Sequence, residues 1–81
     1  MRLDKYLKVT RLIKRRTVAK EACDSGRVLV SGKPARASYE VKIGDQITIQ
    51  LGSRTVCVEV LQINEHVPKG EAVSQYRMLS S

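Results

Sequence analysis

The sequence of 81 residues contains no phenylalanine and no tryptophan, a single histidine and only two cysteines. Three tyrosines are its only aromatic residues, so the core must be built mainly from Leu, Ile, Val and Ala. A chain of this length buries only about 60–65% of the surface that its unfolded form exposes. We therefore expect one domain at most, with little room for a buried cofactor pocket or a multi-part active site.

Long apolar runs are missing as well. No segment approaches the roughly 18 apolar residues that a membrane-spanning helix needs. Charges recur from Arg2 onward, which is unlike the apolar centre of a secretory signal. We expect a cytoplasmic protein that does not enter the membrane. Cys23 and Cys57 form no metal-ligand spacing and are interpreted as small buried hydrophobic residues, with a disulfide or a metal as the less favoured alternative.

Catalytic constellations are equally scarce. His66 lies in a predicted loop without a nucleophile or carboxylate placed beside it, so it is interpreted as a solvent-exposed side chain. The five glycines form neither a P-loop nor a dinucleotide fingerprint, and the carboxylates are scattered. The sequence predicts no catalytic residues, no metal site and no cofactor, and hence no enzyme.

Basic residues are abundant and unevenly placed. Fifteen Lys and Arg face eight Asp and Glu, which gives a net charge of +7. Residues 1–36 hold eleven of these bases and three acids, whereas residues 37–81 hold four bases and five acids. A surface so asymmetric attracts polyanions, with nucleic acid as the first candidate and an anionic membrane as the second.

Helical periodicity covers the first 26 residues. Apolar or small side chains follow the spacing of one helix face at Leu3, Tyr6, Leu7, Thr10 and Ile13. A second helix is predicted over residues 18–24, with Thr17 as its N-cap and Gly26 after its end. Its inward face carries Ala19, Ala22 and Cys23. The two short helices, joined by residues 12–16, read as a helix–turn–helix unit.

Strand periodicity begins at Arg27. A short strand at Val28–Val30 is followed by a turn at residues 31–34 and a predicted return strand at residues 35–37. Residues 46–51 and 55–61 alternate cleanly on either side of Gly52, which predicts a hairpin. Residues 64–74 read as a mobile loop, and residues 76–79 as a final edge strand. The fold class is thus α+β, with two helices packed on a small antiparallel sheet of four to five strands.

The basic residues of the helical part form one constellation. It comprises Arg2, Lys5, Lys8, Arg11, Arg15, Arg16 and Lys20. The first three recur every three residues and so occupy one side of the first helix. Arg16 stands beside the start of the second helix, where free N–H groups and the helix dipole favour a phosphate. We predict that this basic face binds nucleic acid.

Two other interpretations of the same residues are weaker. A surface that merely confers solubility normally mixes both signs of charge, but Asp4 is the only acid among the first eight bases. A membrane-binding helix needs large apolar residues free for lipid, and here the apolar stripe is short and belongs to the core. Because exposed aromatics for base stacking are also lacking, we expect phosphate contacts and shape recognition of folded RNA or DNA.

Four segments in register resemble the S4-like RNA-binding domain family. They are residues 2–7 (RLDKYL), 16–19 (RTVA), 26–35 (GRVLVSGKPA) and 41–47 (VKIGDQI). Ser31 stands where the family more often has Asn. The resemblance implies an αα unit on a small curved antiparallel sheet, the alpha-L motif, over residues 1–62. Residues 63–81 are expected to add a loop and an edge strand to the same domain.

Among the stand-alone members of this family, the chain most resembles a factor of bacterial ribosome-associated quality control. The resemblance implies binding to rRNA of the obstructed large ribosomal subunit and to peptidyl-tRNA. It further implies support of alanine tailing of stalled nascent chains together with RqcH, by a protein that is monomeric off the ribosome. The RNA contacts carry over to Arg2, Lys5 and Arg16, with Arg11, Arg15 and Lys20 as neighbours.

Two alternatives stay open. The heat-shock-type S4-like proteins also bind obstructed large subunits, without a role in tailing, but they are longer and carry a basic tail. The near-neutral balance of residues 37–81 argues against such a tail. The other alternative is a small adaptor that binds a protein through its sheet, near the edge strand at Tyr76.

Overall fold

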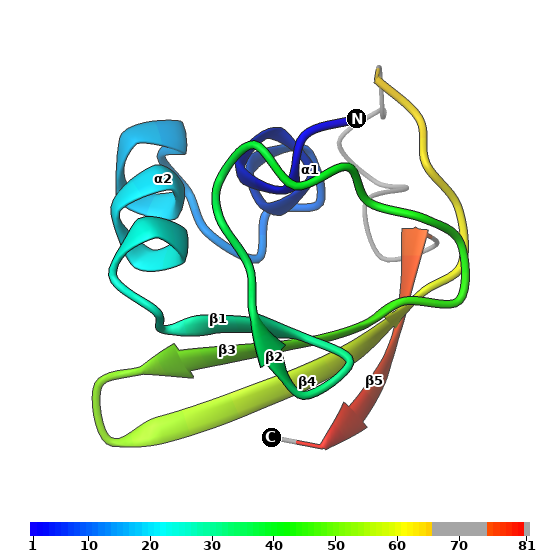
Figure 1. Cartoon of the computed structure of the whole chain (residues 1–81). Helices are drawn as coiled ribbons and strands as arrows, with labels where there is room; N and C mark the ends of the chain where they lie inside the picture. Colours follow the sequence, from blue (N-terminus) through cyan, green and yellow to red (C-terminus); the bar gives the residue numbers. More distant parts are fainter. Residues whose placement is uncertain (66–74, 81) are drawn as a thin grey trace.

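A computed structural model describes residues 1–65 and 75–80, which form two helices and five strands (Figure 1). The elements are α1 (Leu3–Val9), α2 (Arg16–Asp24), β1 (Val28–Val30), β2 (Lys33–Pro34), β3 (Gln46–Leu51), β4 (Arg54–Val60) and β5 (Tyr76–Ser80). The strands form one sheet in the order β2-β1-β3-β4-β5, and every neighbouring pair is antiparallel. The α+β prediction with four to five strands is confirmed.

Helix α1 buries the face that the sequence predicts. Leu3, Tyr6 and Leu7 are at most 1% exposed. The helix ends after Val9, because the Thr10 hydroxyl donates to the Tyr6 carbonyl oxygen at 2.7 Å and Arg11 adopts a positive φ of 62°. Ile13, which the sequence pattern placed on the same face, is buried but lies in the joint after the helix.

Helix α2 begins earlier than predicted. Thr17 is not its N-cap: the helix begins at Arg16, and Arg15 occupies the N-cap position in an extended conformation. The Ala19 N–H donates to the Arg15 carbonyl oxygen at 3.0 Å, so the backbone closes the first turn without the Thr17 hydroxyl. The inward face is as predicted, with Ala19, Ala22 and Cys23 buried.

The β1–β2 hairpin turns more tightly than predicted. Ser31 and Gly32 both have positive φ, at 52° and 83°, the conformation of a two-residue hairpin turn. Pairing therefore resumes at once, with Val30 opposite Lys33. The return strand is Lys33–Pro34 and not residues 35–37, where the prediction was wrong.

The β3–β4 hairpin and the edge strand agree with the sequence pattern. The inward positions of the hairpin are at most 5% exposed, namely Ile47, Ile49, Val56, Val58 and Val60. Strand β5 pairs with β4 through Val60 and Tyr76 and extends to Ser80. Most of the predicted loop, including His66, lies outside the described residues.

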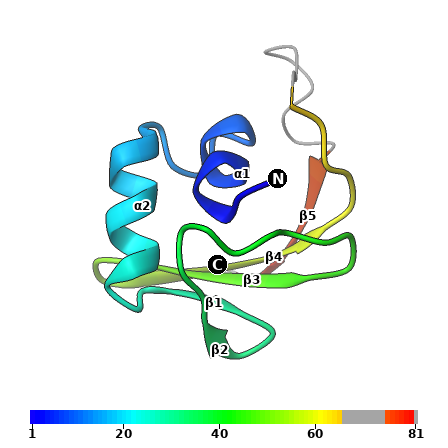
Figure 2. The ribbon, with the colours of Figure 1, turned by 45° about the horizontal axis from the view of Figure 1, so that its top comes forward.

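The helices lie side by side on one face of the sheet, as Figures 1 and 2 show. The core fills the space between the two layers, where Leu3 and Leu7 join the same cluster as Ile47 and Val58. Cys23 belongs to this core, and burial raises the pKa of its thiol to about 11. Cys57 is half-buried, and both cysteines are free thiols. No helix among the described residues is long and apolar enough to cross a bilayer.

Residues 36–41, which we call the crossing segment, tie the two helices together (Figure 1). The Leu3 N–H donates to the Tyr39 carbonyl oxygen at 2.8 Å, and the Asp4 N–H to that of Ala37 at 3.2 Å. The Ala37 N–H donates in turn to the Asp24 carboxylate at 3.0 Å. The crossing segment thus caps the start of α1 and is held by the last turn of α2.

Two isoleucines test this account of the core. Ile47→Ala should lower the free energy of unfolding by roughly 2–5 kcal/mol, because Ile47 is fully buried between the helices and the sheet. Ile43→Ala makes the same chemical change at a side chain that is 69% exposed, and should cost less than about 0.5 kcal/mol. Urea unfolding followed by circular dichroism measures both. Equal losses would contradict the assignment of the core.

Candidate nucleic-acid interface

The Asp4 carboxylate lies at the centre of the basic face, with its side chain only 3% exposed. Its Oδ1 accepts from Arg2 Nε at 3.1 Å and from the Lys5 N–H at 2.8 Å. Its Oδ2 accepts from Arg16 Nε at 3.4 Å. One buried carboxylate therefore joins the N-cap of α1 to the first residue of α2. We call these three residues, Arg2, Asp4 and Arg16, the arginine clasp.

The clasp keeps Asp4 ionised. Burial by itself would raise the pKa of this carboxyl, but the hydrogen bonds from Arg2, from the Lys5 N–H and from Arg16 outweigh it and hold the pKa below 3.8. The two guanidinium groups stay accessible, since the Arg2 and Arg16 side chains are 48% and 49% exposed. Arg16 is thus anchored through Nε, whereas Arg2 is anchored through both Nε and Nη2, which donates to Asp4 Oδ2 at 3.3 Å.

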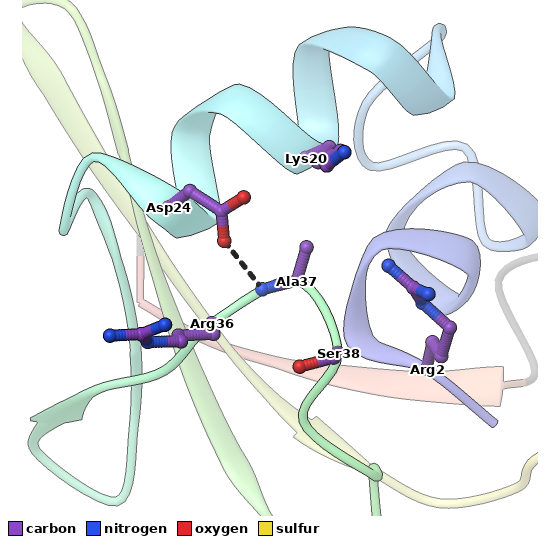
Figure 3. Close-up of a pocket in the computed structure, with 6 residues that line it drawn as sticks. All are labelled: Arg2, Lys20, Asp24, Arg36, Ala37 and Ser38. Atoms are coloured by element: carbon purple, nitrogen blue, oxygen red, sulfur yellow. Dashed lines mark hydrogen bonds between the residues drawn. The ribbon is translucent and has the colours of Figure 1, made fainter.

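A hollow of about 480 Å³ opens beside the clasp, and we call it the cationic hollow. It is lined by Arg2, Lys20, Asp24, Arg36, Ala37 and Ser38. Figure 3 shows Ala37 between α2, which carries Lys20, and the start of α1, which carries Arg2. A smaller hollow of about 290 Å³ adjoins it and is lined by Arg2, Asp4, Arg16, Thr17 and Lys20. Together they place three of the predicted basic residues, Arg2, Arg16 and Lys20, around one concave surface.

The other predicted residues lie elsewhere. The Lys5 ammonium pairs with the Glu65 carboxylate at 3.3 Å. Lys8, Arg11 and Arg15 are exposed along the outer side of α1 and the joint, and within the described residues they line neither hollow. The sequence predicts one basic region, whereas in the structure three of its seven residues line the concave surface and the other four lie outside it.

Sequence reasoning missed Arg36, Ser38 and Asp24. Arg36 and Ser38 belong to the crossing segment and reach the cationic hollow only through the fold. Asp24 also lines it, and its carboxylate holds the Ala37 N–H. The only signal for Arg36 was its place in the basic first 36 residues, which did not separate it from the other cations.

The start of α2 keeps its N–H groups open. In the part of the chain that the structure describes, the N–H groups of Arg16, Thr17 and Val18 have no protein acceptor. Those of Leu3, Asp4 and Lys5 at the start of α1 are all occupied, by Tyr39, Ala37 and the Asp4 carboxylate. A phosphate beside Arg16 would therefore meet both a guanidinium and open backbone donors.

Among the described residues, no group of three His, Cys, Asp or Glu side chains could hold a metal ion. What the arrangement offers is a concave surface with two anchored arginines and the exposed cations Lys20 and Arg36, which suits the phosphates of a nucleic-acid backbone.

Comparison with known proteins also indicates a relation to proteins that act on RNA. The family model described as S4 domain matches residues 1–47. The chain is 49% identical over 98% of its length to the RQC P-site tRNA stabilizing factor of Bacillus subtilis, and covers 92% of that protein. It is 51% identical over 96% of its length to the factor of the same name from Halalkalibacterium halodurans, of which it covers 89%. Among solved structures, heat shock protein 15 of Vibrio cholerae superposes with a TM-score of 0.90 at 32% identity, covering 99% of this chain and 82% of that one.

Asp4→Asn tests the arginine clasp. The substitution keeps an acceptor for the Lys5 N–H but removes the charge that holds both arginines, so the free energy of unfolding should fall by roughly 1–3 kcal/mol at pH 7. Because the pKa of Asp4 lies below 3.8 in the folded protein, the contribution of the carboxylate is fully present above that unfolded value. It is lost as pH falls through the lower folded value.

The difference in stability between wild type and Asp4→Asn should hence stay constant from pH 7 to about pH 5 and shrink below about pH 4. Chemical denaturation at a series of pH values measures it. A difference that persists undiminished in strong acid would show that the ionised carboxylate does not hold the clasp.

Proposed function

The chain belongs to the S4 domain family, within the group of the RQC P-site tRNA stabilizing factors, and we propose that it is a non-catalytic RNA-binding factor of ribosome-associated quality control. The name of its relatives, which match over nearly the whole chain, supports a role in this pathway. In finer terms, it binds rRNA of the obstructed large ribosomal subunit and peptidyl-tRNA. It thereby supports alanine tailing of stalled nascent chains with RqcH, in the cytoplasm where the ribosomes are.

The arginine clasp is the observation that carries this proposal. RNA binding by long flexible cations costs side-chain entropy, and that cost falls when the side chains are ordered beforehand. Asp4 fixes Arg2 through Nε and Nη2 and fixes Arg16 through Nε, so both need little further ordering to meet a phosphate. Phosphate contacts of this kind set the position and orientation of an RNA and do not read its sequence. This is the property that a factor which steadies a tRNA on the ribosome requires.

The proposed RNA-binding domain comprises residues 1–62, and residues 63–81 belong to the same domain. Two contacts support the extension beyond the residues that match the family model. Strand β5 completes the sheet beside β4, and the Tyr6 hydroxyl of α1 donates to the Gln75 carbonyl oxygen at 2.7 Å.

The heat-shock-type function is the second candidate, because heat shock protein 15 shares the fold with a TM-score of 0.90. The higher identity to the tRNA stabilizing factors favours the first. In a strain that lacks the protein, alanine tails on stalled chains should disappear, whereas the heat-shock-type function leaves them in place. Mass spectrometry of a stalled reporter measures the tails, and re-expression of the wild-type protein is the control.

Lys20→Ala tests RNA binding without disturbing the fold. Lys20 lines the cationic hollow and the smaller hollow beside Arg16. It is exposed and makes no ion pair with the described residues, so its removal leaves no buried partner. Arg2 and Arg16 are less suitable because Asp4 would stay buried without them. If Lys20 neutralises one phosphate, large-subunit affinity should fall, and the slope of log affinity against log salt should lessen by about 0.7–0.9.

Arg54→Ala is the matched control, since it removes the same charge from an exposed site at the β3–β4 turn. Ribosome pelleting at rising salt measures both variants. If Lys20→Ala binds like wild type, or if Arg54→Ala weakens binding equally, the cationic hollow is not the RNA site. Binding that is independent of salt throughout would favour the adaptor interpretation.

A further inference from the structure

Another hollow, of about 420 Å³, adjoins the cationic hollow on the side of the β1–β2 turn. It is distinct from the smaller hollow beside Arg16, and we call it the second hollow. Its walls include Val30, Pro34 and Ala35 from the hairpin side and Tyr39 from the crossing segment. Lys33 and Arg36 supply its charges, and none of the described residues that line it is acidic. Arg36 and Ser38 line both hollows, so the two are neighbours along the crossing segment. In Figure 3, the Arg36 side chain points away from Arg2, toward the far side of the cationic hollow.

Tyr39 is the best-fixed wall of this second hollow. Its hydroxyl donates to Asp45 Oδ2 at 2.9 Å. Its backbone N–H donates to the Arg36 carbonyl oxygen at 3.0 Å, and its carbonyl oxygen accepts from the Leu3 N–H at 2.8 Å. The ring is therefore held at its tip and at its backbone. A half-buried aromatic ring that is ordered in advance can take a flat apolar group at little cost in entropy.

The combination of walls indicates the chemistry of the occupant. Apolar and aromatic walls suit a flat ring system, and two cations at the rim suit a phosphate attached to it. A nucleotide unites both parts, and sites of several hundred Å³ are the usual size for small ligands. An acidic peptide would match the cations but would leave the apolar walls unused.

We propose that the second hollow holds one unpaired nucleotide of the RNA that the cationic hollow binds. Its base lies against Tyr39 and Pro34, and its phosphate contacts Arg36. An RNA strand seated on Arg2 and Lys20 reaches this place by continuing past Ser38, which both hollows share. The proposal rests on the RNA-binding function above and adds to it a preference for RNA with an unstacked base. The sequence, with so few aromatic residues, did not predict such a site.

Two RNA hairpins test the proposal. They share one stem and loop, and one of them carries a single unpaired nucleotide in its stem. By fluorescence anisotropy, wild-type protein should bind the bulged hairpin about fivefold more tightly or better, since base–aromatic contacts are worth at least that. Tyr39→Leu should abolish the preference and leave binding to the paired hairpin unchanged. Tyr39→Phe keeps the ring and should keep the preference.

Arg36→Ala gives a second variant at an exposed side chain, in case Tyr39→Leu lowers stability. It too should reduce the preference for the bulged hairpin, whereas Arg54→Ala should not. Equal binding of the two hairpins by wild type, or a preference that survives Tyr39→Leu and Arg36→Ala, overturns the proposal. Free nucleoside monophosphates that bind as tightly as the bulged hairpin overturn the assignment to RNA.

These outcomes are separable from a failure of the proposed function. Lys20→Ala should weaken binding of both hairpins equally, because it acts on the shared phosphate contacts. If Lys20→Ala weakens binding of both hairpins and wild type shows no preference between them, the result supports the RNA-binding face and contradicts the nucleotide site. If Lys20→Ala changes neither, the RNA-binding face itself falls.

Discussion

The basic face depends on the interaction of one buried carboxylate with two arginines. Without Asp4, Arg2 and Arg16 would repel one another across the start of the two helices, and their side chains would sample many rotamers. Asp4 links the starts of the two helices and holds both arginines beside the same concave surface. The net positive charge of the chain attracts a polyanion, and the clasp fixes where two of the charges stand. Asp4, an acid among many bases, is therefore part of the candidate binding surface.

The crossing segment connects the basic face to the rest of the fold, because it hydrogen-bonds to both helices. Its carbonyl oxygens accept from the first N–H groups of α1, and its Ala37 N–H donates to the Asp24 carboxylate. It also places Arg36 and Ser38 at the cationic hollow. A sheet without it would leave the start of α1 uncapped over the core. Because the same few residues cap a helix and line two hollows, the shape of the basic surface is coupled to the integrity of the core beneath it.

Most of the architecture could be predicted from the sequence, since it follows local patterns. The alternation of Ile47 and Ile49 gave the β3–β4 hairpin, and the spacing of Leu3 and Leu7 gave the buried face of α1. The errors have tertiary or turn-specific causes. The start of α2 depends on a backbone contact of Arg15, and the length of the β1–β2 turn on two left-handed residues. Likewise the pairing of Lys5 with Glu65 joins positions sixty residues apart, which no local pattern reports.

The contact between the Tyr6 hydroxyl and the Gln75 carbonyl oxygen has a consequence for biosynthesis. A helix as short as α1 is not stable by itself, and the segments that hold it are made after it: the crossing segment follows by residue 41 and Gln75 later still. During synthesis, α1 therefore precedes the groups that fix it in place. The hollow beside Arg2 needs Arg36 and Ser38 as well, so it cannot form before the crossing segment has been made.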